Sequence, residues 1–136
     1  KINYLLILLF SIFSYSNTNI TIGESDIYIE SKRIEISREN NEIHFKDMLK
    51  IKNEYILISG SNAVFNNQKK ILNITGNKAN IFSNSSENTF SGSAETIFIN
   101  ADNSIELFGD AVFESDGIKF KSSSIKFNQQ NGKILE

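Results

Sequence analysis

Apolar and polar residues alternate along almost the whole chain from Ile27 to Ile134. Successive side chains of a β-strand point to opposite faces of the sheet, so a period of two indicates strands with one apolar face. Outside the first sixteen residues, no stretch shows a helical period with capping residues. The pattern therefore predicts an all-β domain.

Turn residues divide this alternation into many short strands. The pairs Asn40-Asn41, Gly76-Asn77, Gly109-Asp110 and Asp116-Gly117 are predicted turns, and the polar stretch Ser83 to Thr89 is the one predicted long loop. Short strands with turns at this spacing are typical of a sandwich, a barrel or a solenoid.

One set of apolar residues shares the inward phase of these strands and is the predicted inner face. A bend at Ser31-Lys32 separates the first two predicted segments. The set consists of Ile27, Ile29, Ile34, Ile36, Ile43, Phe45, Leu49, Ile51, Ile56, Ile58, Ile97, Ile99, Ile105, Leu107, Phe113, Ile118, Phe120, Ile125 and Phe127.

The alternation also repeats itself at an offset of 62 residues. The segment 41–45 is echoed by the segment 103–107, Ile56 falls on Ile118, and Phe65-Asn66 falls on Phe127-Asn128. A repeat at a fixed offset predicts that one meander of strands is used twice.

The first residues differ from the rest and have the features of an export signal. Lys1 supplies a positive charge, an apolar run of ten residues extends from Tyr4 to Phe13, and Ser14-Tyr15-Ser16 supplies small residues for cleavage after Ser16. Residues 1–16 are therefore predicted to be a signal peptide, and residues 17–136 the exported domain. The alternative is a retained membrane anchor, although ten helical residues span only about 15 Å of a roughly 30 Å hydrocarbon layer.

Composition removes several classes of function. A chain of 136 residues with a net charge of −2 forms one domain and lacks the basic surface expected of a nucleic-acid-binding protein. It has no cysteine, and its single histidine, His44, alternates with inward Ile43 and Phe45 and is expected to face outward. The sequence therefore favours a non-enzymatic protein without a metal or other cofactor.

Two segments carry a resemblance to a known family. Asp26-Ile27-Tyr28-Ile29-Glu30-Ser31 resembles the opening strand of the OstA-like (LptA-type) lipopolysaccharide transport proteins. The segment from Ile105 to Phe113, which includes Gly109-Asp110-Ala111, resembles the repeated unit of that family, and residues 118–127 complete the unit. The first copy departs from the family pattern, because Asp47 stands where the family prefers glycine and Ser59-Gly60-Ser61 replaces an Ala-Asp pair.

The resemblance implies a fold and a function for residues 25–136. The fold is a twisted, V-shaped β-jellyroll, open at both ends, and its apolar interior carries the acyl chains of lipopolysaccharide across the periplasm. The inner face defined above would then bind lipid. The implied partners are a membrane-anchored LptC-like protein, the N-terminal domain of an LptD-like outer-membrane translocon, and further copies of the chain stacked head to tail.

Stacking of this kind needs two open sheet edges, since unpaired strands pair readily with another chain. The predicted opening edge consists of Ile27, Tyr28, Ile29 and Glu30, and the predicted closing edge of Lys133, Ile134 and Leu135.

Two alternative functions stay open at this point. Retention of residues 1–16 as an anchor would indicate the LptC-like component of the same system. If the inner face is only a dry core, the chain is a structural β-solenoid or surface protein. Each inward residue taken singly is better explained as core, so only the whole set, together with the resemblance, favours a lipid channel.

Overall fold

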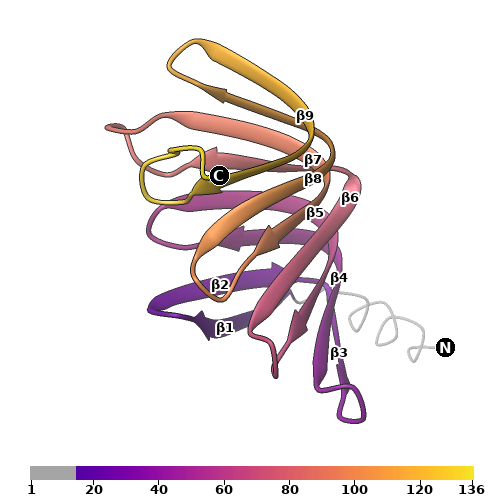
Figure 1. Cartoon of the computed structure of the whole chain (residues 1–136). Coiled ribbons are helices and arrows are strands. Elements are labelled where there is room, and N and C mark those ends of the chain that lie inside the picture. The colour runs from indigo at the N-terminus through magenta and orange to yellow at the C-terminus, as the bar shows by residue number, and fades with distance from the viewer. Residues whose placement is uncertain (1–14) are drawn as a thin grey trace, which may run out of the picture.

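The computed structural model describes residues 15–136, which form one antiparallel sheet without a helix (Figure 1). Most of the predicted signal peptide, residues 1–14, lies outside the described residues. The strands are β1 (Ser16–Ile22), β2 (Ser25–Ser31), β3 (Arg33–Ser37), β4 (Glu42–Lys52), β5 (Ile56–Asn66), β6 (Ile71–Ser83), β7 (Phe90–Ile99), β8 (Ser104–Ser115) and β9 (Ile118–Asn128).

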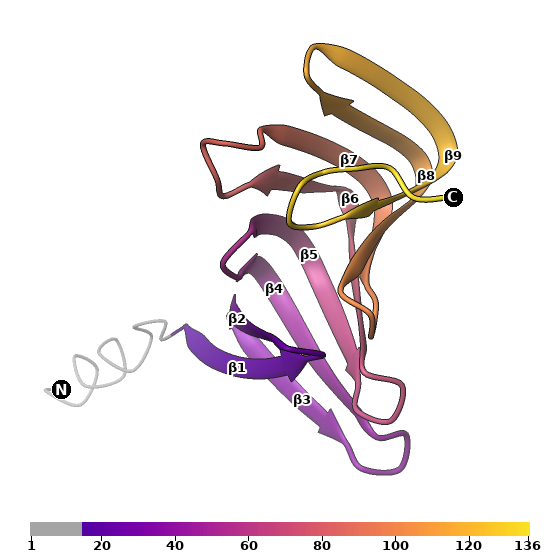
Figure 2. The same ribbon diagram turned by 60° about the vertical axis from the view of Figure 1, so that its left-hand side comes forward.

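The strands follow one another across the sheet as a meander. Their order is β1-β2-β4-β5-β6-β7-β8-β9, and β3 pairs with β4 beside the end of β2 (Figure 2). β2 pairs with residues 50–52 of β4, and β3 pairs with residues 42–46 of the same strand. β2 and β3 are therefore two halves of one long strand that bends at Ser31-Lys32. The predicted all-β fold and the predicted bend are both confirmed.

The sequence repeat has a counterpart in the fold. Adding 62 to the bounds of β5 (Ile56–Asn66) gives those of β9 (Ile118–Asn128), and the same shift places β4 on β8, which is one residue longer at its end. The backbone agrees as well, because Asp47 and Met48 in β4 and Gly109 and Asp110 in β8 all have positive φ. The meander β4–β5 is therefore used again as β8–β9.

Two of the predicted turns are wrong, because Gly76-Asn77 lies inside β6 and Gly109-Asp110 lies inside β8. Near these two residue pairs, the register shifts between every two neighbouring strands from β4 to β9. The shifts lie between Lys46/Leu49, Ser59/Asn62, Thr75/Ala79, Ser93/Thr96 and Phe108/Ala111. A β-bulge bends its strand and increases the local twist. These bulges form a column that divides each long strand into two arms. The connections at Asn40-Asn41, Ser83–Thr89 and Asp116-Gly117 lie near strand ends as predicted.

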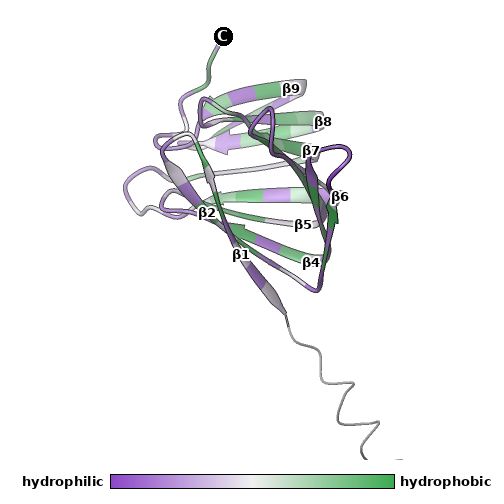
Figure 3. Ribbon diagram, turned by 90° about the horizontal axis from the view of Figure 1, so that it is seen from below, coloured by the Kyte–Doolittle hydropathy of each residue, from purple (hydrophilic) through white to green (hydrophobic). Residues whose placement is uncertain are grey.

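The two arms face each other across the inner face of the sheet. We call the side built on β3 and residues 42–46 of β4 arm 1, and the side built on β1, β2 and residues 49–52 of β4 arm 2. Figure 3 looks along the stack of strands from the β1 end and shows the arms enclosing the inner face. Three of the loops at the open ends of the arms are called the lips. They are residues 100–103 on arm 1, and residues 23–24 and 53–55 on arm 2.

Candidate functional site

Apolar residues cross the sheet from strand to strand in continuous rows. In arm 1 the register aligns one row that consists of Ile34, Phe45, Ala63, Ile74, Ile97, Leu107 and Ile125. A parallel row consists of Ile36, Ile43, Phe65, Leu72, Ile99, Ile105 and Phe127. The row in arm 2 consists of Ile29, Ile51, Ile58, Ile81, Gly92, Phe113 and Phe120. Cross-strand pairs of this kind are the unit of sheet stabilisation, so the rows hold the meander together and give it one apolar face.

Most of the predicted inner face is closed to solvent. The buried residues are Ile27, Ile29, Phe45, Leu49, Ile51, Ile56, Ile58, Ile97, Ile99, Ile105, Leu107, Phe113, Ile125 and Phe127, and the partly buried Ile34 and Ile43 pack against them. In this conformation the two arms therefore pack on each other through their inner faces.

Three predicted inner residues are exposed instead, and all three lie at the ends of the stack. Ile36 on β3 is 70% exposed, and on β9 Ile118 is 57% and Phe120 is 38% exposed. Each occupies an outermost strand of residues 15–136, and within that range no further strand covers it. The ring of Phe120 still lies 6.5 Å from the ring of Phe113, centroid to centroid, which places it at the open end of the inner face.

Aromatic rings join the two arms near the β9 end. The centroid of Phe127 in arm 1 lies 4.4 Å from that of Phe113 and 5.3 Å from that of Phe90, both in arm 2. Phe90 is absent from the predicted inner face, because it directly follows the polar stretch predicted to be a loop. Ile20 and Ile22 on β1 are absent from it as well. Their alternation with Thr21 ahead of Gly23 is a usable strand signal.

A buried polar contact, which we call the clasp, ties the lips together. Nδ2 of Asn53, on the arm 2 lip, donates to Oε1 of Gln129 at 2.7 Å, and Nε2 of Gln129 donates to the backbone carbonyl of Asn103, on the arm 1 lip, also at 2.7 Å. Gln129 is 2% exposed. Gly23, in the turn between β1 and β2, also lies against Asn103. Buried polar groups of this kind are costly to leave unpaired, so the clasp favours closed lips.

Asp102 orders the arm 1 lip. Its carboxylate accepts hydrogen bonds from the backbone N–H of Ser104 at 3.0 Å and from the Ser104 hydroxyl at 2.6 Å. These two bonds hold the pKa of Asp102 below its ordinary value. They also fix the loop in which Asn103 has a φ of 67° and presents its carbonyl to Gln129.

This pKa shift leads to a prediction about pH. Because the pKa of Asp102 is lower in the folded chain than the value of about 3.9 expected in an unfolded chain, its stabilisation is present above that pH and is lost as pH falls through the folded value. We expect Asp102→Ala to lower Tm by a few degrees at pH 7 and to have a much smaller effect near pH 2. Thermal unfolding of both proteins across this range is the measurement. An effect that does not change with pH would contradict it.

The predicted opening edge is wrong. Residues 28–30 of β2 pair with β1 on one side and with β4 on the other, so β1 is the edge strand of arm 2 at this end of the sheet. At the opposite edge, the backbone N–H of Leu135 donates to the carbonyl of Lys126 and that of Asn128 to the carbonyl of Lys133, each at 2.8 Å. The predicted closing strand, Lys133 to Leu135, thus folds back on β9, and Ile118–Ile125 of β9 carry the unpaired edge.

Two sizeable cavities lie away from the packed inner face. One, of about 650 Å³, is an apolar groove on the outer face of arm 2, lined among others by Tyr28, Leu57 and Phe82. The other, of about 570 Å³, lies at the lips and is polar, with Asn53 and Asn103 in its lining.

Other chemistry is sparse in the part of the chain that the structure describes. His44 is half-buried, with Nε2 3.2 Å from a carboxylate oxygen of Glu42. Among residues 15–136 there is no cluster of three potential metal ligands. Within the same range, none of the structure is a helix long and apolar enough to span a membrane.

Comparison with known proteins places this arrangement in a family. The chain matches a solved structure described as LptH, the LptA homologous periplasmic component of the lipopolysaccharide transport device from Pseudomonas aeruginosa, with a TM-score of 0.72 and 13% sequence identity over 85% of each chain. No curated protein matches it by sequence. The family described as "LptA/(LptD N-terminal domain) LPS transport protein" matches residues 28–133. The match covers most of the chain and both arms of the sheet, and the chain therefore belongs to this family of lipopolysaccharide transport proteins.

Proposed function

We propose that this domain carries the acyl chains of lipopolysaccharide between its two arms, and that it does so in the periplasm. The observation that carries the proposal is the set of apolar rows, which run from β3 and β2 to β9 without a polar interruption. Exposed Ile36 at one end and Ile118 and Phe120 at the other extend this face to both openings of the stack.

Lipid uptake requires the arms to part, because their inner side chains are closed to solvent. The lips are the place where they can separate, since the column of bulges joins the arms on the other side. Each acyl CH₂ moved from water to the inner face gains about 0.8 kcal/mol. Opening the clasp costs only a few hydrogen bonds at about 1 kcal/mol each. A lipid with several long chains can therefore hold the arms apart.

The sheet edges supply a route for passing the cargo on. β1 at one end and Ile118–Ile125 of β9 at the other leave backbone groups unpaired, and strand addition at such edges makes few sequence demands. We propose that copies stack head to tail through these edges. The β1 end receives lipid from a membrane-anchored LptC-like protein, and the β9 end delivers it to the N-terminal domain of an LptD-like translocon.

One observation favours a second function. The inner side chains pack as tightly as a structural core, with Phe45, Phe113 and Phe127 among the fully buried ones. A domain whose arms never part would be a structural spacer. The deciding measurement is whether protein purified from the periplasm contains lipopolysaccharide.

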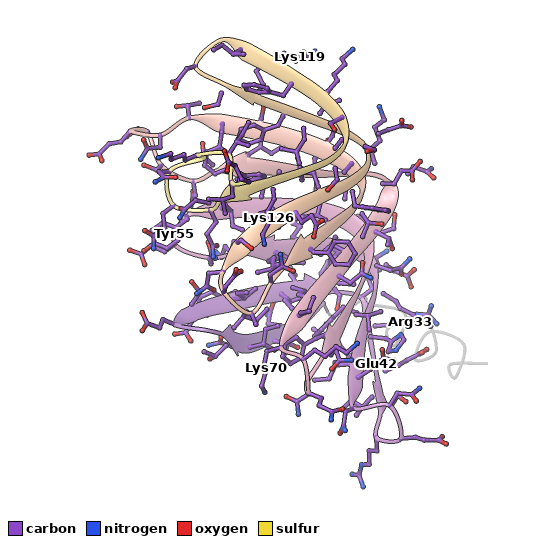
Figure 4. All side chains as sticks on the ribbon, in the orientation of Figure 1. Arg33, Glu42, Tyr55, Lys70, Lys119 and Lys126 are labelled. Carbon is purple, nitrogen blue, oxygen red and sulfur yellow. The ribbon has the colours of Figure 1, made fainter. Side chains whose placement is uncertain are left out.

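A crosslinking experiment tests the channel directly. The photo-reactive residue benzoylphenylalanine replaces Phe120, which faces Phe113 on the inner side, or its neighbour Lys119, which pairs with Glu114 on the opposite side (Figure 4). We expect crosslinking to lipopolysaccharide to be strong at position 120 and near background at position 119. Both sites are exposed and adjacent, so each serves as the control for the other. Equal labelling would refute a lipid path along the inner face.

A further inference from the structure

The segment after β9 performs two tasks with very few residues. We call residues 129–135 the tail. Its far end, Lys133 to Leu135, pairs with the edge of β9, and its first residue, Gln129, makes the clasp between the lips.

The tail occupies backbone groups that an added strand would need. The N–H of Asn128 and the carbonyl of Lys126 point away from β8 and are bonded to Lys133 and Leu135. An incoming strand that pairs first with the open edge over Ile118–Ile125 reaches these groups next. The incoming strand and the tail cannot both form hydrogen bonds with these two groups. Continued pairing of the incoming strand along β9 therefore displaces the tail.

A short, tight loop connects this edge to the clasp. The N–H of Gly132 donates to the carbonyl of Asn128 at 2.8 Å, and the side chain of Asn128 accepts from the N–H groups of Gln130 and Asn131. Gly132 is buried against the ring of Phe90, where an added Cβ would lie 2.7 Å from a ring carbon. Asn128 thus takes part both in the bonds that hold the tail on β9 and in the loop that positions Gln129.

We propose that the tail couples docking at the β9 edge to opening of the lips. When a strand of the next domain pairs with Lys126 to Asn128, it displaces the tail, withdraws Gln129 from Asn53 and lets the arms part. A domain without a docked neighbour keeps its lips closed and its inner face covered. This coupling rests on the proposed function, because it opens the face proposed to carry lipid.

Spin labels on the two lips make the coupling measurable. Exposed Glu54 and Ala101 lie on opposite lips, and the chain has no cysteine, so Glu54→Cys with Ala101→Cys gives one defined pair for distance measurement by pulsed EPR. Leu135→Pro removes the N–H that donates to Lys126 and releases the tail. We expect amide exchange at Asn128 to rise roughly tenfold, and the lip-to-lip distance distribution to broaden toward longer values.

Two variants complete the test. Gln129→Ala should widen the lips as Leu135→Pro does, whereas Gln130→Ala, which changes an exposed neighbour of the same type, should leave the distance unchanged. Lips that stay closed in Leu135→Pro while Asn128 exchanges freely would overturn the coupling, and so would an Asn128 amide that stays protected. Lipopolysaccharide uptake is measured separately on the same proteins. Lips that stay closed in Leu135→Pro but widen when lipopolysaccharide is added would refute only the coupling, and wide lips without uptake would refute only the proposed function.

Discussion

A disulfide across the lips is expected to reduce lipopolysaccharide loading to background. A Cβ atom built on Gly23 lies 3.2 Å from Cγ of Asn103. The Cβ of Asn103 is bonded to this Cγ, so the two Cβ atoms are close enough for the separation of about 3.5–4.5 Å that a disulfide requires. Oxidised Gly23→Cys with Asn103→Cys would join the turn between β1 and β2 to the loop between β7 and β8. With the lips tied, acyl chains cannot pass between the arms.

Reduction of the same protein provides the control. Loading should return on addition of a reductant, which separates the effect of the crosslink from the effect of the two substitutions. Oxidation should raise the free energy of unfolding by at most about 4.5 kcal/mol, less the strain of placing cysteine at two positions with positive φ. Full loading of the oxidised protein, measured as bound lipopolysaccharide per chain, would show that lipid does not enter between the arms.

The second large effect concerns assembly. If the β1 edge of one domain meets the β9 edge of the next, the interface is heterologous and uses two different patches. Asn19→Cys on β1 and Lys121→Cys on β9 introduce single exposed thiols at the two edges of a chain that otherwise has none. We expect a short bismaleimide to link the two variants into dimers when they are mixed, and to produce few dimers from either variant alone.

The two samples that contain a single variant serve as controls for the mixed sample. Random collision would produce dimers in all three samples in proportion to thiol concentration, and a two-fold symmetric contact would produce them in one of the unmixed samples. Either pattern, read on a denaturing gel, would contradict head-to-tail stacking through these edges.

Local sequence was sufficient for the inner face. Alternation places Phe45, Ile97 and Leu107 on one side of their strands whatever the strands pair with, because the two faces of a strand are set by the backbone itself. The same local rule predicted Phe120 as an inner residue. Its exposure arises because, in the part of the chain that the structure describes, no strand lies beyond β9 at this position, and the rule does not include such long-range pairing.

Two residue pairs that contain glycine show what neighbouring residues alone cannot predict. Gly109-Asp110 and Asp116-Gly117 both have positive φ, yet the first pair bends β8 and the second joins β8 to β9. A bulge and a turn require the same left-handed backbone conformation, so both accept the same residues. Only the long-range pairing of β7 and β9 with both halves of β8 makes the first pair a bulge.

The sequence by itself determined most of the strands and their apolar face, since these depend on residues close together in the chain, and it also showed the repeat and the family resemblance. The tertiary structure decided which strands are edges, how the arms close and which polar groups meet. Asn53 and Gln129 are 76 residues apart, and no local pattern relates them. Their contact exists because the bulges bend the long strands β4 to β9 at one level and so bring the two lips together. The pairing of β1 with β2, and of the tail with β9, determines which edges stay open.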